Sequence, residues 1–322
     1  MPQAIKSRLG YILAFLFIGG MTLVSHLTDE KEIFFPEMLA LAAGGWAAEK
    51  QPWRASRPVM WLLMSLSAGM GILLVGYFPG PVFCKASVAF LFVALCLHLF
   101  GSTLYPMISA CILPILMGVD SPVYPLSVSV MTGLLVLGQW MLEKAGLRKA
   151  NPPAEKERFT GAALRRAGGF WGRLLLVFVP LSFAALALGM PFFIAPPLLV
   201  AFAELAHPAG RLRQHPVKTL LLLIGGGVLG AGLRLAAFYM GLPVLWPAGL
   251  AAAGMLLLFR LTRFILPPAG AMALLPMLLE PAVLPFYPLQ TAAGCLLFFG
   301  MSLLLFPNKA RPVPSAAVTR EV

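Results

Sequence analysis

The residues of this chain that could do chemistry are a few charged side chains that interrupt long apolar segments. Glu37 directly follows Pro36, Glu204 ends an apolar run, and Arg234 lies among small and aliphatic residues. Ionisable side chains inside such segments mark ion pathways, substrate sites or structural pairs. Arg234 could bind an anion, but a pair with Glu204 or Glu280 is favoured because an unpaired buried cation is costly. Glu37 could be a proton or cation site, although capping a helix N-terminus is the simpler role.

A second kind of candidate is the backbone at pairs of prolines. Adjacent prolines suit the first turn of a helix but not its interior. A short helix that begins at such a pair presents unpaired N–H groups and about half a positive charge, which attract an anion. Small residues after the pair allow a ligand or another helix to approach closely. The predicted substrate-binding residues are Pro196, Pro197, Pro267, Pro268, Ala269, Gly270, Ala271 and Arg234. Possible proton, cation or structural positions are Pro36, Glu37, Pro106 and Glu204, the last of which could equally be solvated.

No catalytic constellation accompanies these candidates. The four histidines and four cysteines are scattered, without a CxxC pair or metal-ligand spacing. His98, on an otherwise apolar segment, is expected to be a packing residue. Neither HExxH, GxSxG nor a P-loop occurs in the sequence. We therefore expect no enzyme activity, metal or cofactor, and any transport should be secondary or passive.

Composition indicates where these residues lie. The chain is 60% hydrophobic and 11% charged, with a mean hydropathy of +0.88, whereas a soluble domain carries about a quarter charged residues. Apolar segments of roughly 16 to 24 residues recur from end to end, which suits membrane-spanning helices. We expect an all-α polytopic membrane protein whose partner is the lipid bilayer. The net charge of +12 is attributed to cationic loops and not to nucleic-acid binding, because no basic patch carries interleaved aromatic residues.

The apolar segments repeat with an offset of roughly 160 residues, a sign of repeated architecture. In each half, two prolines 8 residues apart precede a Tyr-Pro pair that opens a long apolar segment. These are Pro106, Pro114 and Tyr124-Pro125, and then Pro268, Pro276 and Tyr287-Pro288. We expect two membrane repeats, 1–142 and 173–307, joined by a basic cytoplasmic linker (143–172) and followed by a cytoplasmic tail (308–322). Their segments are about 8–27, 33–48, 58–78, 86–102, 104–119 and 123–142, and about 173–190, 192–206, 217–240, 244–260, 264–280 and 285–306.

The second and fifth segments of each repeat are too short to cross as helix alone, at about 20 Å against a hydrocarbon core of about 30 Å. They could be re-entrant, giving eight crossings, or could cross as extended chain plus half-helix, giving twelve. With twelve, all lysines and arginines except Lys31, Lys85 and Arg234 lie on one side, the pattern of cytoplasmic loops. We expect twelve crossings in the inner membrane, with both termini cytoplasmic. Three crossings reverse orientation, so each half would be a 3+3 inverted repeat and the two halves parallel, an architecture of transporters and channels.

One stretch resembles a known family. Leu-Thr-Arg at 261–263, followed by Pro-Pro-Ala-Gly-Ala-Met-Ala-Leu-Leu at 267–275, is similar to the signature of the HPP family of integral membrane proteins, in which His-Pro-Pro precedes Ala-Gly-Ala. The similarity extends more loosely over 172–307. Some members are implicated in nitrite transport, so the resemblance implies a small-anion permease.

The chain departs from the family pattern at three places. Leu266 stands where the family has its histidine, and Leu198 and Leu199 stand where it prefers Gly-Ala. Residues 1–142 match only through their similarity to the second half. The general layout is also similar to the membrane part of aromatic-acid efflux proteins.

The leading hypothesis is therefore a secondary transporter or channel-like permease for a small anion, nitrite-like or a small carboxylate, bound near the half-helix N-termini. One alternative is an exporter of aromatic or amphipathic compounds. Another is a non-transporting membrane scaffold or assembly protein. A homo-oligomer is compatible with all three.

Overall fold

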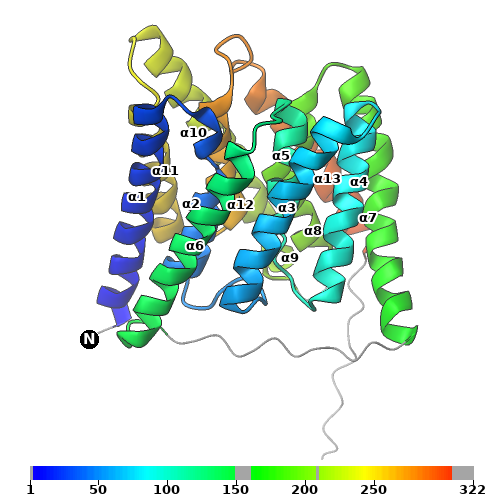
Figure 1. Cartoon of the computed structure of the whole chain (residues 1–322), viewed down its shortest axis with the longest axis horizontal. Helices are drawn as coiled ribbons and strands as arrows, with labels where there is room; N and C mark the ends of the chain where they lie inside the picture. Colours follow the sequence, from blue (N-terminus) through cyan, green and yellow to red (C-terminus); the bar gives the residue numbers. More distant parts are fainter. Residues whose placement is uncertain (1–2, 149–160, 208–209, 307–322) are drawn as a thin grey trace, which may run out of the picture.

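The computed structural model describes residues 3–148, 161–207 and 210–306, and these residues form helices and connecting turns without a strand (Figure 1). Within that part of the chain, eight helices are long and apolar enough to cross a membrane. They are α1 (Gln3–Thr28), α3 (Arg57–Tyr77), α4 (Val82–Leu99), α6 (Val123–Lys144), α7 (Gly161–Ala187), α10 (Pro216–Tyr239), α11 (Leu245–Thr262) and α13 (Tyr287–Leu305). The predicted all-α polytopic membrane architecture is confirmed.

Four short helices lie between the long ones, where the proline-led segments were predicted. They are α2 (Glu37–Ala42) with a π-helical turn η2 (Ala43–Ala47), α5 (Met107–Met117), α8 (Pro196–Ala206), and α12 (Pro267–Leu274) with a 3₁₀ turn η4 (Leu275–Leu278). Minor elements are η1 (Lys31–Ile33), η3 (Pro191–Ile194) and α9 (Arg211–Gln214). In each half, the order of helices along the chain is thus long, short, long, long, short, long. The relation of the halves as parallel, internally inverted repeats stays a prediction.

Two predicted boundaries need comment. Helix α7 begins at Gly161, inside the stretch expected to be a linker, because the alanines, arginines and leucine of 162–166 favour a helix. Residues 149–160 of the predicted linker and the whole predicted tail lie outside the described residues.

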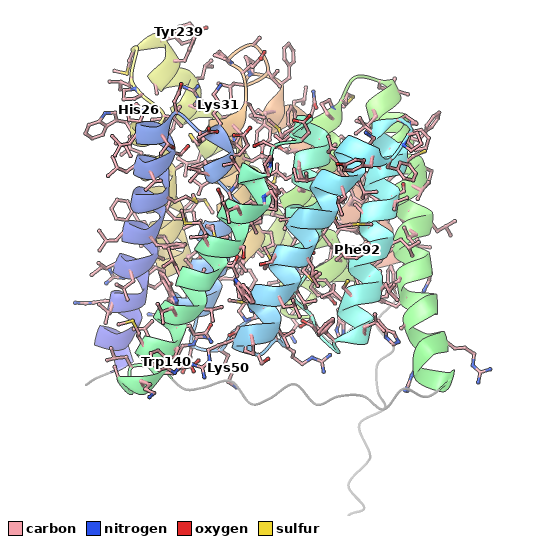
Figure 2. The ribbon with its side chains drawn as sticks, viewed as in Figure 1. His26, Lys31, Lys50, Phe92, Trp140 and Tyr239 are labelled. Atoms are coloured by element: carbon pink, nitrogen blue, oxygen red, sulfur yellow. The ribbon has the colours of Figure 1, made fainter. Side chains whose placement is uncertain are left out.

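The short segments connect opposite ends of the bundle. Helix α1 starts at the lower end of Figure 1 and α3 also starts there, so the chain must return between them. Figure 2 shows Lys31 at the upper end and Lys50 at the lower end, on either side of α2. The other three short helices likewise join two long helices that run in the same direction (Figure 1). A short segment therefore passes through the bundle and does not return to the end where it began.

The short helices occupy the centre of the bundle. Helix α12 packs against α2 and α8, and α8 packs against α5. Every residue of α2 and α12 is buried, as is every residue of α8 except the partly exposed Glu204. The long helices surround this centre and expose leucines such as Leu16, Leu91 and Leu250. An apolar outer surface of this kind suits contact with lipid.

A tyrosine compensates for each internal proline of α5 and η4. A helical carbonyl normally accepts a hydrogen bond from the N–H four residues later, and proline has none. Pro114 therefore leaves the Ala110 carbonyl free, and the Tyr124 hydroxyl donates to it over 2.9 Å. Pro276 leaves the Met272 carbonyl free, and the Tyr287 hydroxyl donates to it over 3.0 Å. The tyrosine that follows each of these prolines in the sequence thus has a definite physical function.

Glycines bring long helices onto short ones. A Cβ atom at Gly71 of α3 would lie 2.5 Å from the Cys111 carbonyl oxygen of α5. A Cβ atom at Gly226 of α10 would lie 2.6 Å from the Ala269 carbonyl oxygen of α12, and one at Gly230 would collide with Ala273. Only glycine permits backbones to approach this closely.

Candidate functional site

A cavity of about 860 Å³ opens between the ends of the four short segments. It lies at the end of the bundle where Figure 2 places Lys50. Its walls include the C-terminal ends of two of these segments and the N-terminal approaches of the other two. The wall residues from these segments are Ala47 and Ala48 after α2, Thr103 and Tyr105 before α5, Glu204 and His207 at the end of α8, and Ile265 and Pro267 at the start of α12. All four short segments therefore contribute to one site.

The cavity carries more cations than anions. Four basic side chains line it, against two carboxylates. The basic residues are Lys50, Arg54, Arg260 and Arg263, and the acids are Glu49 and Glu204. Apolar walls of low dielectric focus the field of such groups. The balance favours an anionic guest.

Arg54 is held in place by the chain segment that leads into α5. Its backbone N–H donates to Thr103 Oγ1 over 2.8 Å. Its carbonyl accepts from Ser102 Oγ over 2.8 Å and from the Thr103 N–H over 3.2 Å. These hydrogen bonds join the loop after η2 to the segment that leads into α5. They hold the backbone of Arg54 in place at the cavity wall.

The charge of Arg54 reaches two other groups of the cavity. His207 is half-buried, and burial lowers its pKa below the usual value while the positive charge of Arg54 lowers it further. The imidazole is therefore neutral at neutral pH. Tyr105 lies within electrostatic reach of both Arg54 and Glu204. The site thus joins charges from the first half of the chain to charges from the second half.

The turn between α11 and α12 forms another part of the wall. Arg263 has a positive φ of 51°, and the Lys218 ammonium donates to the Thr262 carbonyl over 2.6 Å. A left-handed conformation costs a non-glycine residue roughly 1–2 kcal/mol, and such strain gathers at functional positions. Leu266 is extended, so the chain approaches Pro267 as predicted and the helix starts at that residue.

The predicted proline-pair residues lie close to the centre, and one of them reaches the cavity. Pro267 lines it. The remaining six are buried, namely Pro196, Pro197, Pro268, Ala269, Gly270 and Ala271. Two prolines at each helix start remove two donors, and the N–H groups of Leu198 and Ala269 donate to Ala195 and Leu266. The backbone therefore offers few free donors, and anion attraction at this end rests on side-chain cations and the positive end of the α12 dipole.

Arg234 lies apart from this site. It belongs to the part of α10 near Tyr239, which Figure 2 places at the end opposite Lys50, whereas Glu204 lines the cavity. Its Nε atom is buried and has no hydrogen-bond partner, and Glu280 is exposed. Glu204 lies at the opposite end of the bundle from Arg234, and Arg234 and Glu280 form no ion pair. The favoured pair is therefore not formed.

Pro36 and Pro106 precede the first residues of α2 and α5. Glu37 is the first residue of α2, is 2% exposed, and does not line the cavity. Among the residues that the structure describes, no group of three His, Cys, Asp or Glu could hold a metal ion.

The sequence alone does not identify the four basic residues of the cavity as site residues, because in the sequence they resemble ordinary loop charges. Their position directly beside the short segments was the signal that could have singled them out.

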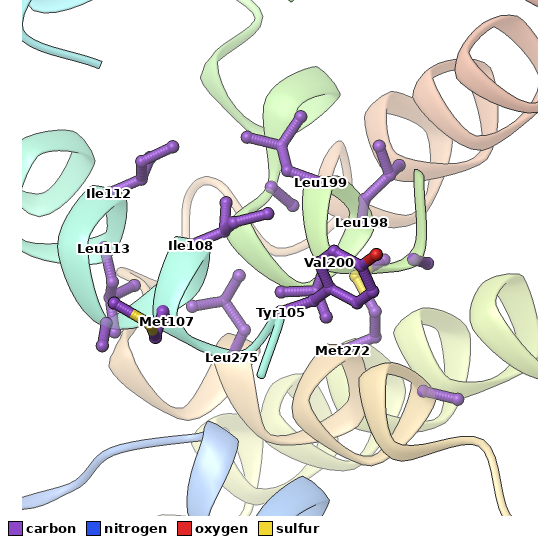
Figure 3. Close-up of a cluster of buried hydrophobic side chains, with 14 of the residues drawn as sticks. Tyr105, Met107, Ile108, Ile112, Leu113, Leu198, Leu199, Val200, Met272 and Leu275 are labelled. Carbon is purple, nitrogen blue, oxygen red and sulfur yellow. The ribbon is translucent and has the colours of Figure 1, made fainter. Parts of the chain in front are cut away.

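Beyond the cavity, the described residues at the centre of the bundle are closely packed. Apolar side chains of α5, α8, α12 and η4 fill the space between the short helices (Figure 3). Ile108, Leu198, Leu199 and Met272 are fully buried there, and Leu275 is 1% exposed. We refer to these five residues as the central apolar cluster.

No family model matches this chain, and no curated protein or solved structure shows significant similarity to it.

Proposed function

We propose that the protein is a secondary transporter for a small anion and that the basic cavity is its entrance. The observation that carries the proposal is the meeting of all four short segments around Lys50, Arg54, Arg260 and Arg263. Interrupted helices at membrane depth occur where they are buried in protein or line a cavity. A polytopic protein with a cationic cavity among broken helices fits an anion carrier better than a purely structural protein.

The cavity end is proposed to face the cytoplasm. The positive-inside tendency supports this, because the wall cations and the exposed Arg165, Arg166 and Lys144 belong to segments at that end, whereas Lys31 lies at the other (Figure 2). The proposed location is the inner membrane, with both termini cytoplasmic. The arrangement described above would then be a cavity open to the inside.

The proposed transport cycle uses two halves that are related by pseudo-symmetry. Equivalent contacts support that relation, since α2 packs on α12 as α5 packs on α8, and α1 packs on α11 as α7 packs on α4. The two tyrosine–carbonyl bonds are a further matched pair. Repeats of this kind permit alternating access, in which one part rocks against another around a central site. Opening toward the other side would separate the central apolar cluster.

The likeness of 261–275 to the HPP family supports nitrite as a first substrate to test. Leu266 and the loose match of the first half leave the choice of anion open, so small carboxylates belong in the same panel. Transport would be driven by an ion gradient or by the anion gradient itself.

The test is uptake of nitrite and of formate into proteoliposomes, with protein-free liposomes as the baseline. We expect saturable flux, and Arg263→Gln should reduce kcat/KM about tenfold or more, because a hydrogen bond to a charged group contributes roughly 1.5–3 kcal/mol. Arg166→Gln is the matched control, since Arg166 is exposed on α7 outside the cavity wall. Absence of flux for both anions, with and without a proton gradient, would count against the proposal.

A second candidate is export of aromatic or amphipathic compounds. The cavity volume of about 860 Å³ suits a drug-sized molecule, and Tyr11, Tyr105 and Phe259 contribute rings to its wall. Benzoate, which combines an aromatic ring with a carboxylate, separates the two candidates. Flux of benzoate at the expense of nitrite and formate would favour the exporter. A scaffold function would leave all three anions untransported.

A further inference from the structure

A buried carboxyl group lies outside the cavity, and the groups beside it are the Ser109 hydroxyl and its own backbone N–H. Glu37 is 2% exposed, and its Oε1 atom has no hydrogen-bond partner among the described residues. Ser109 of α5 lies beside this carboxyl, is fully buried, and its Oγ atom is also without a partner in hydrogen-bond geometry. Unsatisfied polar atoms are rare in packed interiors. The carboxyl and the hydroxyl therefore lie in contact without a complete set of hydrogen bonds.

We propose that Glu37 is the proton-binding site of the transporter, taking up one proton and releasing it in each cycle. The inference rests on the proposed transport function, because a proton site of this kind serves to couple a gradient to a substrate. With a monovalent anion, one proton and one anion per cycle would make transport electroneutral.

The surroundings of Glu37 favour a neutral carboxyl in the packed state. Helix α2 packs against α1, α6, α12 and η2. The ionisable side chains described on these elements, together with those of α5 and α13 that act on this region, are Arg8, Tyr11, His26, Cys111, Tyr124, Glu143, Lys144 and Tyr287. Helix α12 and η2 contribute none. Among the described residues, Glu37 forms no ion pair. A carboxylate without a counter-ion in an apolar interior is strongly disfavoured, so it takes up a proton.

A metal cation fits this place less well than a proton does. Hard cations need six or more oxygen ligands, and Glu37 and Ser109 offer three side-chain oxygens. The nearby carbonyls of Ala110 and Met272 already accept hydrogen bonds from Tyr124 and Tyr287. A proton needs one oxygen, and the Ser109 hydroxyl can rotate to suit either form of the carboxyl.

The segment that carries Glu37 also forms part of the cavity wall. Glu37 lies at its beginning, and Ala47 and Ala48 line the cavity at its end. A Cβ atom at Gly270 would lie 3.2 Å from Leu39 Cγ, so α12, which starts at the cavity, touches α2 close to Glu37. A change at the anion entrance therefore has a direct mechanical route to the carboxyl.

The first test is infrared spectroscopy of the purified protein in lipid during a pH titration. We expect the C=O stretch of a protonated carboxyl that titrates in the wild type and in the exposed control Glu280→Gln, and is missing in Glu37→Gln. Glu37→Asp should keep the band at a shifted frequency, which covers the case that the amide variant folds poorly. An unchanged band in Glu37→Gln would overturn the proposal whatever the substrate is.

The second test is nitrite transport in proteoliposomes. Glu37→Gln should lose accumulation driven by a proton gradient while it retains nitrite exchange without a gradient. Gradient-driven accumulation at the wild-type level in this variant would refute the proton role but leave anion transport intact. Accumulation that requires sodium instead of a proton gradient would also refute it. Absence of nitrite flux in the wild type would contradict the proposal of anion transport. The infrared titration would still show whether Glu37 binds a proton.

Discussion

Several side chains in this protein supply hydrogen bonds that the interrupted short helices lack. Tyr124 and Tyr287 each supply a donor that a proline lacks, and each tyrosine is buried. Arg54 is fixed by the loop that leads into α5. Glu37 and Ser109 differ from these residues, because one buried oxygen of each lacks a hydrogen bond of good geometry, as the Arg234 Nε atom also does. The contrast separates residues that stabilise the fold from residues that are available for function.

The tyrosine bonds give a test at the residue scale. Tyr124→Phe and Tyr287→Phe should each lower the free energy of unfolding by about 1–3 kcal/mol, because the carbonyl of Ala110 or Met272 would be buried without a donor. Thermal unfolding in detergent measures the loss. Tyr77→Phe, at an 83% exposed position, is the control and should have no effect. Equal stability of the two buried variants and the control would contradict this account.

At the scale of elements, proline spacing predicted the four short helices. Pro36, Pro106, Pro196 and Pro267 each lie at or directly before the start of one. The reason is local, since proline fixes its own φ and suits a first turn. The cavity could not be predicted in the same way. Its wall joins residues as distant in sequence as Arg54 and Arg263, and only the packing of separate helices brings them together.

The interface between α10 and α12 gives a test at this scale. Gly226→Ala and Gly230→Ala should destabilise the protein by roughly 1–3 kcal/mol, because the added methyl group meets the α12 backbone at Ala269 or Ala273. Gly232→Ala on the same helix is the matched control, since nothing lies within 4 Å of its Cβ position. There the higher helix propensity of alanine should leave stability unchanged or raised. A loss at Gly232 as large as at Gly230 would rule out the packing explanation.

At the scale of the whole molecule, the distribution of basic residues agrees with the path of the chain through the bundle. Counting lysines and arginines predicted that the short segments cross, and the upper position of Lys31 and the lower position of Lys50 in Figure 2 agree with that prediction. The relation between halves is harder to read from sequence, because the two halves share prolines, tyrosines and glycines but few charges. Glu37 has no counterpart in α8, where Pro197 is followed by leucines. The proposed proton site therefore belongs to the first repeat alone, whereas both repeats contribute cations to the cavity.

Labelling of introduced cysteines tests the topology. Lys50→Cys should react with an impermeant maleimide only from the cytoplasmic side, and Tyr239→Cys only from the outside, since both positions are exposed and lie at opposite ends. Cys84→Ser provides the background, because the other three native cysteines are buried. The reversed pattern, with position 50 reached only from the outside and position 239 only from the cytoplasm, is expected if the short segments do not cross, and it would exclude their crossing.

The central apolar cluster has a consequence for the membrane itself (Figure 3). A continuous water-filled pore would conduct ions at rest and dissipate the cell's electrical potential. The described core is closed by Ile108, Leu198 and Met272, so in the proposed transport cycle each passage would await a rearrangement on the microsecond-to-millisecond timescale. Patch recordings should accordingly show no unitary conductance, and a cell could hold many copies of the protein without running down its energy supply.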